Sequence, residues 1–501
     1  MTPSKQRLLT KSRFVNGLQC SKWIWLEFNR PEELPKTDEA TQHRFDEGHK
    51  VGELAKSLFP DGINIEEIDT AKNHEKTKEL LKKRKSLFEA GFIHPDGKCY
   101  ARADILIPVG KNEWDILEVK SATSVKEEYI WDVAFQKYVY ESAGLKIRNC
   151  SLMHINNQFV KQGEVKAEEF FIKADINDEV KDFMPEVPKK IKELLKIIEL
   201  KECPEITQDN YCDDPLHVHD NDKFWKEHPE CDVFDLYRGG KLALELFSQG
   251  ILEIKNIPEC HHHRFNDKHK IQHACAREGN HHVDKKELSS FIKSLKYPVY
   301  FLDFESYNTA IPLYNGLKPY QQICFQYSLH IIKKKGAKPE HFSFIAEGAD
   351  DPRPEFMKSL KKNLGAKGSI VVYNQSFEQT RLKEMALFLP LYQKWVDSVN
   401  KRMVDLLIPF RNFAYYHPKQ KGSASIKHVL PVLTGETYED FEIANGSEAS
   451  LSYLFITHGN YEGQKATPEE IKKVRTDLGK YCGQDTEGMI WILDKLNNLI
   501  K

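Results

Sequence analysis

The spacing of hydrophobic positions in the first 200 residues alternates between a helical period and a strand period. Helical spacing covers residues 23–28, 45–59 and 124–143, with Gly144 as the stop of the third helix. Strand-like runs cover residues 100–109, 114–119 and 150–155, and the first two are joined by a turn at Gly110-Lys-Asn. Strand, strand, helix and strand in this order predict an α/β domain over residues 1–200.

A second α/β pattern begins near Tyr297. Apolar runs predict strands over residues 299–304, 323–332, 341–346 and 369–373, and helices over residues 354–364 and 377–388. A last helix begins with Thr467 as N-cap, Pro468 in the first turn and Glu470 at the capping-box position. We therefore expect a second α/β domain over residues 296–501. Residues 201–295 show a weaker pattern with one clear helix, Gly240 to Gly250, and are interpreted as a mostly helical connecting region.

Composition excludes a polycation and a membrane protein. The formal net charge is −2, 40% of the residues are hydrophobic, and no apolar run approaches the roughly 18 residues of a membrane span. The N-terminus lacks the apolar core of a secretory signal, so we expect a cytoplasmic protein without a membrane partner. Short basic runs such as Lys82–Lys85 could contact nucleic acid, although each alone is more simply a solvated surface.

The first candidate site combines an acid from each of the first two predicted strands. Asp104 and Glu118 would lie on adjacent strands, and Lys120 would share the face of Glu118 because strand side chains alternate. Hard divalent cations take oxygen ligands, and an ammonium beside them can orient water or stabilise an oxyanion. Gln136 and Tyr140, four residues apart on the next helix, share one face. Taken alone, Glu118 and Lys120 could equally be a solvated strand edge.

The second candidate site lies in the last third of the chain. Asp303 and Glu305 share one face of a strand, and Asp485 follows Tyr481 by one helical turn. Two carboxylates this close could share a pair of metal ions, and the phenol could position the attacking water. Glu378, at a strand-to-helix junction, would point toward the same pocket, with Asp405 as the reserve candidate. The competing interpretation of Asp303-Phe-Glu305 is an ordinary strand with surface acids.

The first set of motifs resembles the RecB-like branch of the PD-(D/E)XK nucleases. The likeness rests on Arg102-Ala-Asp104, Leu117-Glu118-Val-Lys120 and Gln136-Lys-Tyr-Val-Tyr140, and residues 9–23 resemble the start of CRISPR-associated RecB-like exonucleases. The resemblance implies a restriction-endonuclease-like fold, with Asp104 and Glu118 binding metal and Lys120, Gln136 and Tyr140 in the catalytic motifs. That branch commonly has a metal-binding histidine after Gly-x-x-Val, whereas here His49 lies inside Gly48-His-Lys-Val51.

The second set resembles the DEDD 3′→5′ exonucleases of the RNase H-like fold, in the variant with tyrosine in the last motif. The resemblance implies metal ligands at Asp303, Glu305, Glu378 and Asp485, with Tyr481 orienting the nucleophile; most members have Asp where Glu378 stands. The pairing of both domains also resembles a family of uncharacterised bacterial proteins, through residues 300–305, 319–322 and 325–330.

Together the motifs favour a nuclease with two active centres that uses Mg²⁺ or Mn²⁺ and acts on DNA, single-stranded or frayed, with RNA as a second candidate. Roles in repair, CRISPR-type adaptation or phage defence, with a helicase or defence-system partner, are compatible. The alternative keeps only the C-terminal exonuclease active, with the N-terminal domain as a nucleic-acid-binding or scaffold module. A purely binding protein is disfavoured, because carboxylates repel phosphate unless a cation intervenes.

Cysteines and histidines suggest further metal sites, which we do not expect to be occupied. Relatives with an iron–sulfur cluster pair an early cysteine with a tight later group of three, whereas here the candidates are spread out: Cys20, Cys203, Cys212, Cys231, and His217 and His219 in place of later cysteines. We therefore expect structural cysteines and no cluster. In the middle region, Cys260-His-His-His263 and His273-Ala-Cys275 could bind zinc, but no repeated Cys-x-x-Cys fixes a site, and surface residues are favoured.

Overall fold

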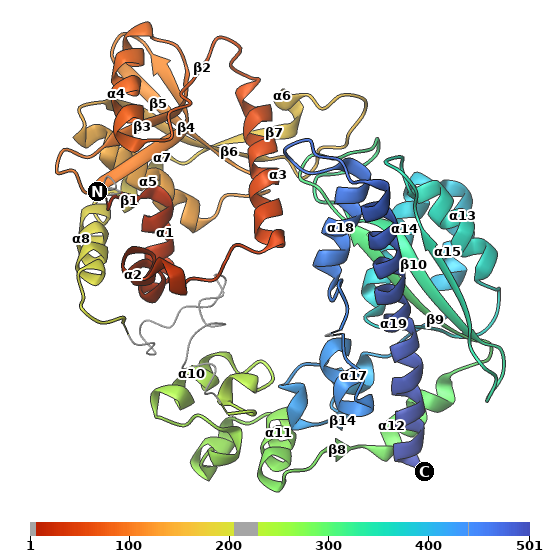
Figure 1. The fold of residues 1–501 in the computed structure, drawn as a ribbon. Helices are drawn as coiled ribbons and strands as arrows, with labels where there is room; N and C mark the ends of the chain where they lie inside the picture. The colour runs from red at the N-terminus through yellow and green to blue at the C-terminus, as the bar shows by residue number, and fades with distance from the viewer. Residues whose placement is uncertain (1–6, 205–228, 439) are drawn as a thin grey trace. The chain divides into compact units, whose positions relative to one another are not determined.

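The computed structural model describes residues 7–204, 229–438 and 440–501 of the 501-residue chain. The fold is mixed α/β, as the sequence predicts, and the chain divides into two compact units (Figure 1). The first unit comprises Met1–Lys226 and Thr309–Gln321, and the second comprises Glu227–Asn308 and Gln322–Lys501. Among the described residues, every helix is too short or too polar to cross a lipid bilayer.

A seven-stranded sheet forms the centre of the first unit. The strands run in the order β2 (Ile63–Asn64), β3 (Leu87–Ile93), β4 (Cys99–Val109), β5 (Glu113–Lys120), β6 (Lys146–Ile155) and β7 (Phe171–Asp175), and β1 (Leu9–Thr10) pairs with β4. Strands β3, β4 and β5 form an antiparallel meander, and β6 lies parallel to β5. The chain passes from β5 to β6 through helix α5 (Glu127–Ser142), as a parallel connection requires.

Helices of the first unit pack against this sheet or against one another. They are α1 (Lys11–Gln19), α2 (Ser21–Asn29), α3 (Glu39–Lys56), α4 (Thr70–Leu80), α6 (Ala167–Phe170), α7 (Asn177–Phe183) and α8 (Val187–Ile198). Thr10 caps α1 by accepting a hydrogen bond from Arg13 N, and Phe14 on α1 stacks on Phe135 on α5 with ring centroids 4.7 Å apart. These contacts fix the first turn of α1, which carries Lys11, beside β4 and α5.

A five-stranded sheet forms the centre of the second unit. Its order is β11 (Glu340–Ile345), β10 (Ile323–Ile332), β9 (Val299–Tyr307), β12 (Ile370–Val372) and β13 (Met403–Asp405). Strand β10 is antiparallel to both β9 and β11, whereas β12 is parallel to β9 and to β13. The apolar runs predicted four of these strands and missed β13, in which only Met403 and Val404 are apolar. A small second sheet pairs β8 (His282–Val283) with β14 (Tyr415–Tyr416).

Some helices of the second unit pack against its sheet, and others come from the middle of the chain. They are α10 (Gly240–Ser248), α11 (Asp267–Glu278), α12 (Lys285–Ser294), α13 (Arg353–Asn363), α14 (Gln375–Phe388), α15 (Gln393–Asn400), α16 (Ile408–Arg411), α17 (Ile426–Thr434), α18 (Gly446–His458) and α19 (Pro468–Ile500). The capping box of Thr467 and Glu470 is present at the start of α19, which runs along β9 and β10 (Figure 1). A Cβ on Gly488 would lie 3.1 Å from Leu430, so glycine permits α17 to pack closely on α19.

The middle region contains more helices than the sequence predicts. Besides α10, the structure has α11 and α12 before residue 295, so the expectation of one clear helix is corrected. The reason lies in α11, where His269, Gln272 and His273 are buried polar residues. Polar side chains on the buried face of a helix hide the apolar period on which the prediction depends.

The segment Thr309–Gln321 connects β9 to β10 but packs with the first unit. Ala310 is fully buried in the same apolar cluster as Val51 and Leu117, and its N–H donates a 2.6 Å hydrogen bond to Glu47 Oε2. Two backbone hydrogen bonds join Lys161 to the segment, from Gly316 N to Lys161 O and from Lys161 N to Leu317 O. The boundary predicted at residue 296 therefore leaves out a piece of the first unit.

Candidate metal centres

Strands β4 and β5 bring Asp104 and Glu118 together in the first unit. The Asp104 carboxylate accepts a 2.8 Å hydrogen bond from Val119 N, the residue next to Glu118, so the two acids lie on adjacent strands. The Glu118 side chain is 1% exposed, whereas Asp104 is 27% exposed. They face a pocket of about 670 Å³ whose other lining residues include His49, Glu89 and Ser121. Basic side chains, among them Lys11 and Lys120, line the same pocket.

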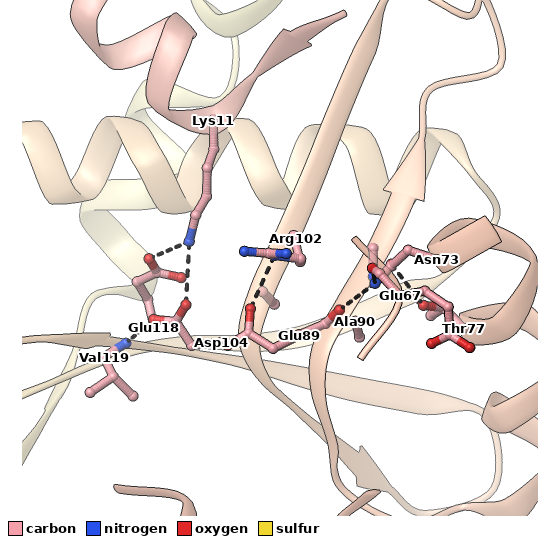
Figure 2. A network of polar contacts seen from close by, with 12 residues as sticks. Lys11, Glu67, Asn73, Thr77, Glu89, Ala90, Arg102, Asp104, Glu118 and Val119 are labelled. Atoms are coloured by element: carbon pink, nitrogen blue, oxygen red, sulfur yellow. Dashed lines mark hydrogen bonds and ion pairs between the residues drawn. The ribbon is translucent and has the colours of Figure 1, made fainter. Parts of the chain in front are cut away.

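An ammonium group lies between these two acids. Figure 2 shows the Lys11 side chain descending from α1, with its Nζ 2.6 Å from Glu118 Oε1 and 3.5 Å from Asp104 Oδ1. Burial lowers the pKa of Lys11, but the charges of Asp104, Asp132 and Glu118 outweigh it and raise the pKa well above its usual value. Sequence reasoning missed Lys11, because no local spacing connects the first turn of α1 to a strand pair about a hundred residues later.

Lys120 and Gln136 complete a charged network around Glu118. Lys120 Nζ lies 2.8 Å from Glu118 Oε1 and 2.7 Å from Asp132 Oδ2. Gln136 Nε2 donates to Glu118 Oε2 at 2.8 Å and to Asp132 Oδ1 at 2.9 Å. Asp132 was not predicted, although it precedes Gln136 by four residues and so shares its helix face. The structure thus places Lys120 and Gln136 beside the predicted acid.

Tyr140 and His49 lie differently from what the motif alone suggests. The Tyr140 hydroxyl is fully buried, where it accepts a 2.8 Å hydrogen bond from Ala103 N and donates to Ala90 O. Its contacts are with the backbone of β3 and β4, so it fixes the strand that carries Asp104. His49, on α3, lines the same pocket as Asp104 and Glu118.

In the second unit, β9 and α19 bring four predicted residues to one pocket. Asp303 and Glu305 extend from β9, and Tyr481 and Asp485 extend from α19. All four line a pocket of about 480 Å³, together with Tyr373, Asn374, Arg411, Ser425, Lys427 and Met489. The residues predicted from distant parts of the sequence therefore meet in space.

Burial and mutual repulsion disfavour the charged forms of these carboxyl groups. Burial, followed by the charge of Asp485, raises the pKa of Asp303 well above its usual value. Burial, followed by the charges of Asp303 and Asp485, does the same for Glu305. Burial raises the pKa of Asp485 to about 6, although hydrogen bonds from Tyr438 and Tyr481 and the charge of Lys427 oppose the shift. A cation among these groups would relieve the repulsion.

Two residues that the sequence did not single out contact this cluster. Tyr438 donates a 2.5 Å hydrogen bond from its hydroxyl to Asp485 Oδ1. Lys427, at the start of α17, lies with its Nζ 5.3 Å from the ring centre of Tyr481 and 5.6 Å from that of Tyr438. Its charge lowers the pKa of both Asp485 and Glu305. Neither residue belongs to a spaced motif, so only the tertiary fold reveals them: Lys427 lies in α17, which packs on α19, and Tyr438 lies in the segment after α17.

Glu378 is the predicted acid that a metal ion would suit best. It lies in the first turn of α14, is 2% exposed, and its Oε2 is buried without a hydrogen-bond partner among the described residues. Burial and the charge of Asp303 raise its pKa well above the usual value. Asp405, the reserve candidate, instead accepts hydrogen bonds from Asn374 N at 2.9 Å and Leu407 N at 3.0 Å. These bonds give Asp405 a structural role at the end of β13.

The cysteine and histidine candidates are scattered over both units. Cys20 and Cys203 belong to one apolar cluster in the first unit, and Cys231 lies in the second unit. Cys275 is buried and Cys260 is exposed, while the rings of His262 and His273 meet edge to face. The remaining three candidates lie outside the described residues: Cys212, His217 and His219.

Comparisons with known proteins find similarity over parts of the chain. Residues 300–425 match the model of a family described as a domain of unknown function, DUF2779. The uncharacterized protein UU173 of Ureaplasma parvum is 32% identical over 231 residues, which make up 43% of this chain and 33% of that protein. The uncharacterized protein MG366 of Mycoplasma genitalium is 28% identical over 242 residues, or 44% of this chain and 35% of that protein.

This chain therefore spans about a third of the length of the curated relatives that it matches. No solved structure matches it. The match over residues 300–425 includes Asp303, Glu305, Glu378 and Asp405, but it ends before Tyr481 and Asp485.

Proposed function

We propose that this protein is a divalent-metal-dependent nuclease that hydrolyses phosphodiester bonds of DNA at two centres, one in each unit. The observation that carries the proposal is the cluster of Asp303, Glu305, Glu378 and Asp485. Burial raises the pKa of all four carboxyl groups, and the charge of a neighbouring acid adds to the shift at Asp303, Glu305 and Glu378, so the charged forms are costly unless a cation or protons neutralise them. Oxygen ligands of this kind suit Mg²⁺ or Mn²⁺.

Strand order in the second unit supports an RNase H-like interpretation. If its strands are counted along the chain from β9, the sheet order is 3-2-1-4-5, with the second strand antiparallel to its neighbours. The catalytic acids of the DEDD resemblance would begin on the central strand, where Asp303 and Glu305 lie. Glu378, whose buried Oε2 has no hydrogen-bond partner among the described residues, fits the third acid of that resemblance. Tyr481, whose phenol lies beside Asp485, fits its last motif.

Topology in the first unit supports a restriction-endonuclease-like interpretation. The meander of β3, β4 and β5, followed by α5 and the parallel strand β6, provides the core order that the resemblance implies. Asp104, Glu118 and Lys120 lie at one pocket on this core. Gln136 orients Glu118 through its 2.8 Å hydrogen bond.

In the proposed reaction, bound metal supplies Lewis-acid activation of water and neutralises charge on the phosphate. The protein's own side chains position the attacking water and place positive charge next to the reacting groups. In the second centre, Tyr481 positions the attacking water beside Asp485, and Lys427 adds positive charge next to the cluster. In the first centre, the Lys120 ammonium stabilises developing negative charge beside Glu118.

A second candidate function keeps only the C-terminal exonuclease active and makes the first unit a nucleic-acid-binding or scaffold module. One observation favours it: Lys11 Nζ, 2.6 Å from Glu118, already neutralises the acids that would bind metal. An ammonium in this position competes with a divalent ion for the same oxygens. RNA as substrate, and a helicase or defence-system partner, remain part of the proposal.

Cleavage of 5′- and 3′-labelled DNA and RNA, with Mg²⁺, Mn²⁺ or chelator, tests the proposal. We expect Glu118→Ala and Asp303→Ala each to remove the metal-dependent cleavage of one centre, by more than about 100-fold, since even outer-shell partners of metal ligands are worth 10- to 100-fold. The double variant should be inactive. Asp267→Asn, a change at a 95% exposed acid of the second unit, is the matched control and should leave cleavage unchanged. Full activity in the double variant would overturn the assignment.

A further inference from the structure

A buried thiol lies against the acidic cluster of the second unit. Cys482 follows Tyr481 on α19, is fully buried, and its Sγ is 3.7 Å from Asp303 Oδ2. Ligand atoms of Asp303, Glu305 and Cys482 all lie within 4.8 Å of one another. Among the described residues, no other three His, Cys, Asp or Glu side chains gather in this way.

These separations match the distances between two ligand atoms that bind the same metal ion. Zinc lies about 2.3 Å from a thiolate sulfur and about 2.0 Å from a carboxylate oxygen. In a tetrahedron, two such ligands are therefore about 3.5 Å apart, close to the observed 3.7 Å between Cys482 Sγ and Asp303 Oδ2. A single ion could thus contact both groups with only small side-chain rotations.

The chemistry of the ligand set selects the class of ion. Carboxylates alone suit Mg²⁺ and Mn²⁺, whereas a thiolate adds strong preference for Zn²⁺ and similar ions such as Co²⁺ and Fe²⁺. Glu378 gives independent support, because its buried Oε2 has no hydrogen-bond partner among the described residues and its carboxyl group interacts with Asp303. It is available as a further oxygen ligand or as an acceptor for a metal-bound water.

We propose that Asp303, Glu305 and Cys482 form a site for a thiophilic divalent ion, and that zinc is the ion that suits it best. This inference deepens the proposed function, on which it rests, by naming the kind of metal at the second centre. The competing possibility is that Cys482 serves only as a hydrogen-bond donor to Asp303.

Cobalt substitution distinguishes these possibilities without an activity assay. A Co²⁺ ion bound by a thiolate shows an intense near-ultraviolet charge-transfer band, which a Co²⁺ ion bound only by oxygen lacks. We expect the full-length protein, stripped with chelator and titrated with Co²⁺, to show this band. Cys482→Ser should lose it, while Cys260→Ser, a change at an exposed cysteine of the same unit, should retain it.

A direct zinc measurement accompanies the spectra. We expect Cys482→Ser to weaken Zn²⁺ binding at least tenfold in calorimetry and to change Mn²⁺ binding less than threefold. Cys482→Ala, with circular dichroism as a check of folding, serves as the second variant. The inference is overturned if the wild-type Co²⁺ spectrum has no thiolate band, if the band survives in Cys482→Ser, or if zinc affinity is unchanged.

Cleavage assays on the same samples separate this inference from the proposed function. A thiolate band that depends on Cys482, in a protein that cleaves no nucleic acid with any metal, would support the site and defeat the nuclease. Cleavage with Mg²⁺ that depends on Asp303, in a protein without the band, would support the nuclease and defeat the zinc site.

Discussion

The lysine residues next to each centre determine its local balance of positive and negative charge. In the first unit, Lys11 and Lys120 both contact Glu118, so two ammonium groups share one buried carboxylate. In the second unit, Lys427 is the lysine that lines the acidic pocket, and its Nζ donates to Ala444 O at 2.6 Å. The first centre is therefore close to electrical balance, whereas the second carries an excess of acid.

Replacing Lys11 with glutamine should strengthen metal binding at the first centre. The substitution removes the ammonium that competes for Asp104 and Glu118, and hydrogen bonds to charged groups are worth about 1.5–3 kcal/mol. We expect at least a tenfold gain in Mn²⁺ affinity, measured by calorimetry in an Asp303→Ala background so that only the first centre responds. Lys11→Arg keeps the cation and should show no gain. Unchanged affinity in Lys11→Gln would contradict the competition.

Removing the charge of Asp485 should stabilise the protein in a pH-dependent way. Its folded-state pKa is about 6, and an exposed Asp titrates at about 3.9. A carboxyl group whose pKa is raised by folding destabilises the folded protein at pH values above its folded-state pKa. This destabilisation disappears as the pH falls toward the pKa of the same group in the unfolded state. At about 1.4 kcal/mol per pKa unit, Asp485→Asn in chelator should be roughly 2–3 kcal/mol more stable than wild type at pH 8.

Thermal unfolding at several pH values checks this prediction. The gap between Asp485→Asn and wild type should narrow between pH 6 and pH 4 and be nearly absent below pH 4. Groups that do not interact with Asp485, such as His330, whose pKa burial lowers to about 4, cancel when the two proteins are compared at each pH. A gap that is constant with pH would contradict the assignment of the cost to the Asp485 carboxylate.

At the scale of elements, α5 supports the first centre along one face. Asp132, Gln136 and Tyr140 follow one another at intervals of four residues and all point toward β4 and β5. The first two contact charged side chains, whereas the Tyr140 hydroxyl bonds to backbone groups and its ring packs on Phe92. The same face therefore orients the acids and fixes the strands that carry them.

Tyr140→Phe should weaken both the fold and the activity of the first unit. The change leaves the buried N–H of Ala103 and the carbonyl of Ala90 without the phenol, and an unsatisfied buried group costs about 1–3 kcal/mol. We expect a loss of this size in chemical denaturation and reduced cleavage in an Asp303→Ala background. Tyr138→Phe, a change at a half-buried tyrosine of the same helix, should cost less than 1 kcal/mol. Equal losses in both would contradict this role.

Sequence periodicity predicted the elements whose pattern is set by one buried face. Strands β4, β5, β9 and β10 were found because apolar residues recur along them in alternation or in short runs. Strand β3 was missed, since Glu89 interrupts its apolar run and adopts a positive φ of 58°. Asp303 and Glu305 could be singled out because residues two apart share one strand face, and Tyr481 and Asp485 because residues four apart share one helix face.

Residues contributed by packing between distant elements could not be predicted. Lys11 and Tyr438 reach the two centres from segments that carry no predicted metal motif, and Cys482 lies between Tyr481 and Asp485 at a position that the spacing of that motif does not single out. Their positions depend on how α1 packs on α5 and how α19 packs along β9, and those contacts are set by the tertiary fold.

At the scale of the whole molecule, the segment Thr309–Gln321 makes the first unit discontinuous in sequence. Its Ala310 is fully buried in the cluster that also contains Val51 of α3, the helix that carries His49. The first unit therefore depends on residues that follow β9 for part of its core.

Burying a charge at Ala310 should destabilise the first unit selectively. An unpaired carboxylate in an apolar cluster is strongly disfavoured, so Ala310→Asp should cost at least about 3 kcal/mol. We expect hydrogen exchange to show faster opening of α3 and β5, with the protection of β12 and α14 little changed. Lys318→Asp places the same group at an exposed position of the same segment and should be tolerated. Equal opening in both variants would contradict the packing role.

The discontinuous first unit also limits how such a protein can be rearranged by recombination. The polypeptide passes from one unit to the other after Lys226, after Asn308 and after Gln321. A gene fusion that joined only residues 1–226 to a foreign partner would leave behind the stretch that covers Val51 and Leu117. We therefore expect the gene segments that encode the two units to stay joined in evolution.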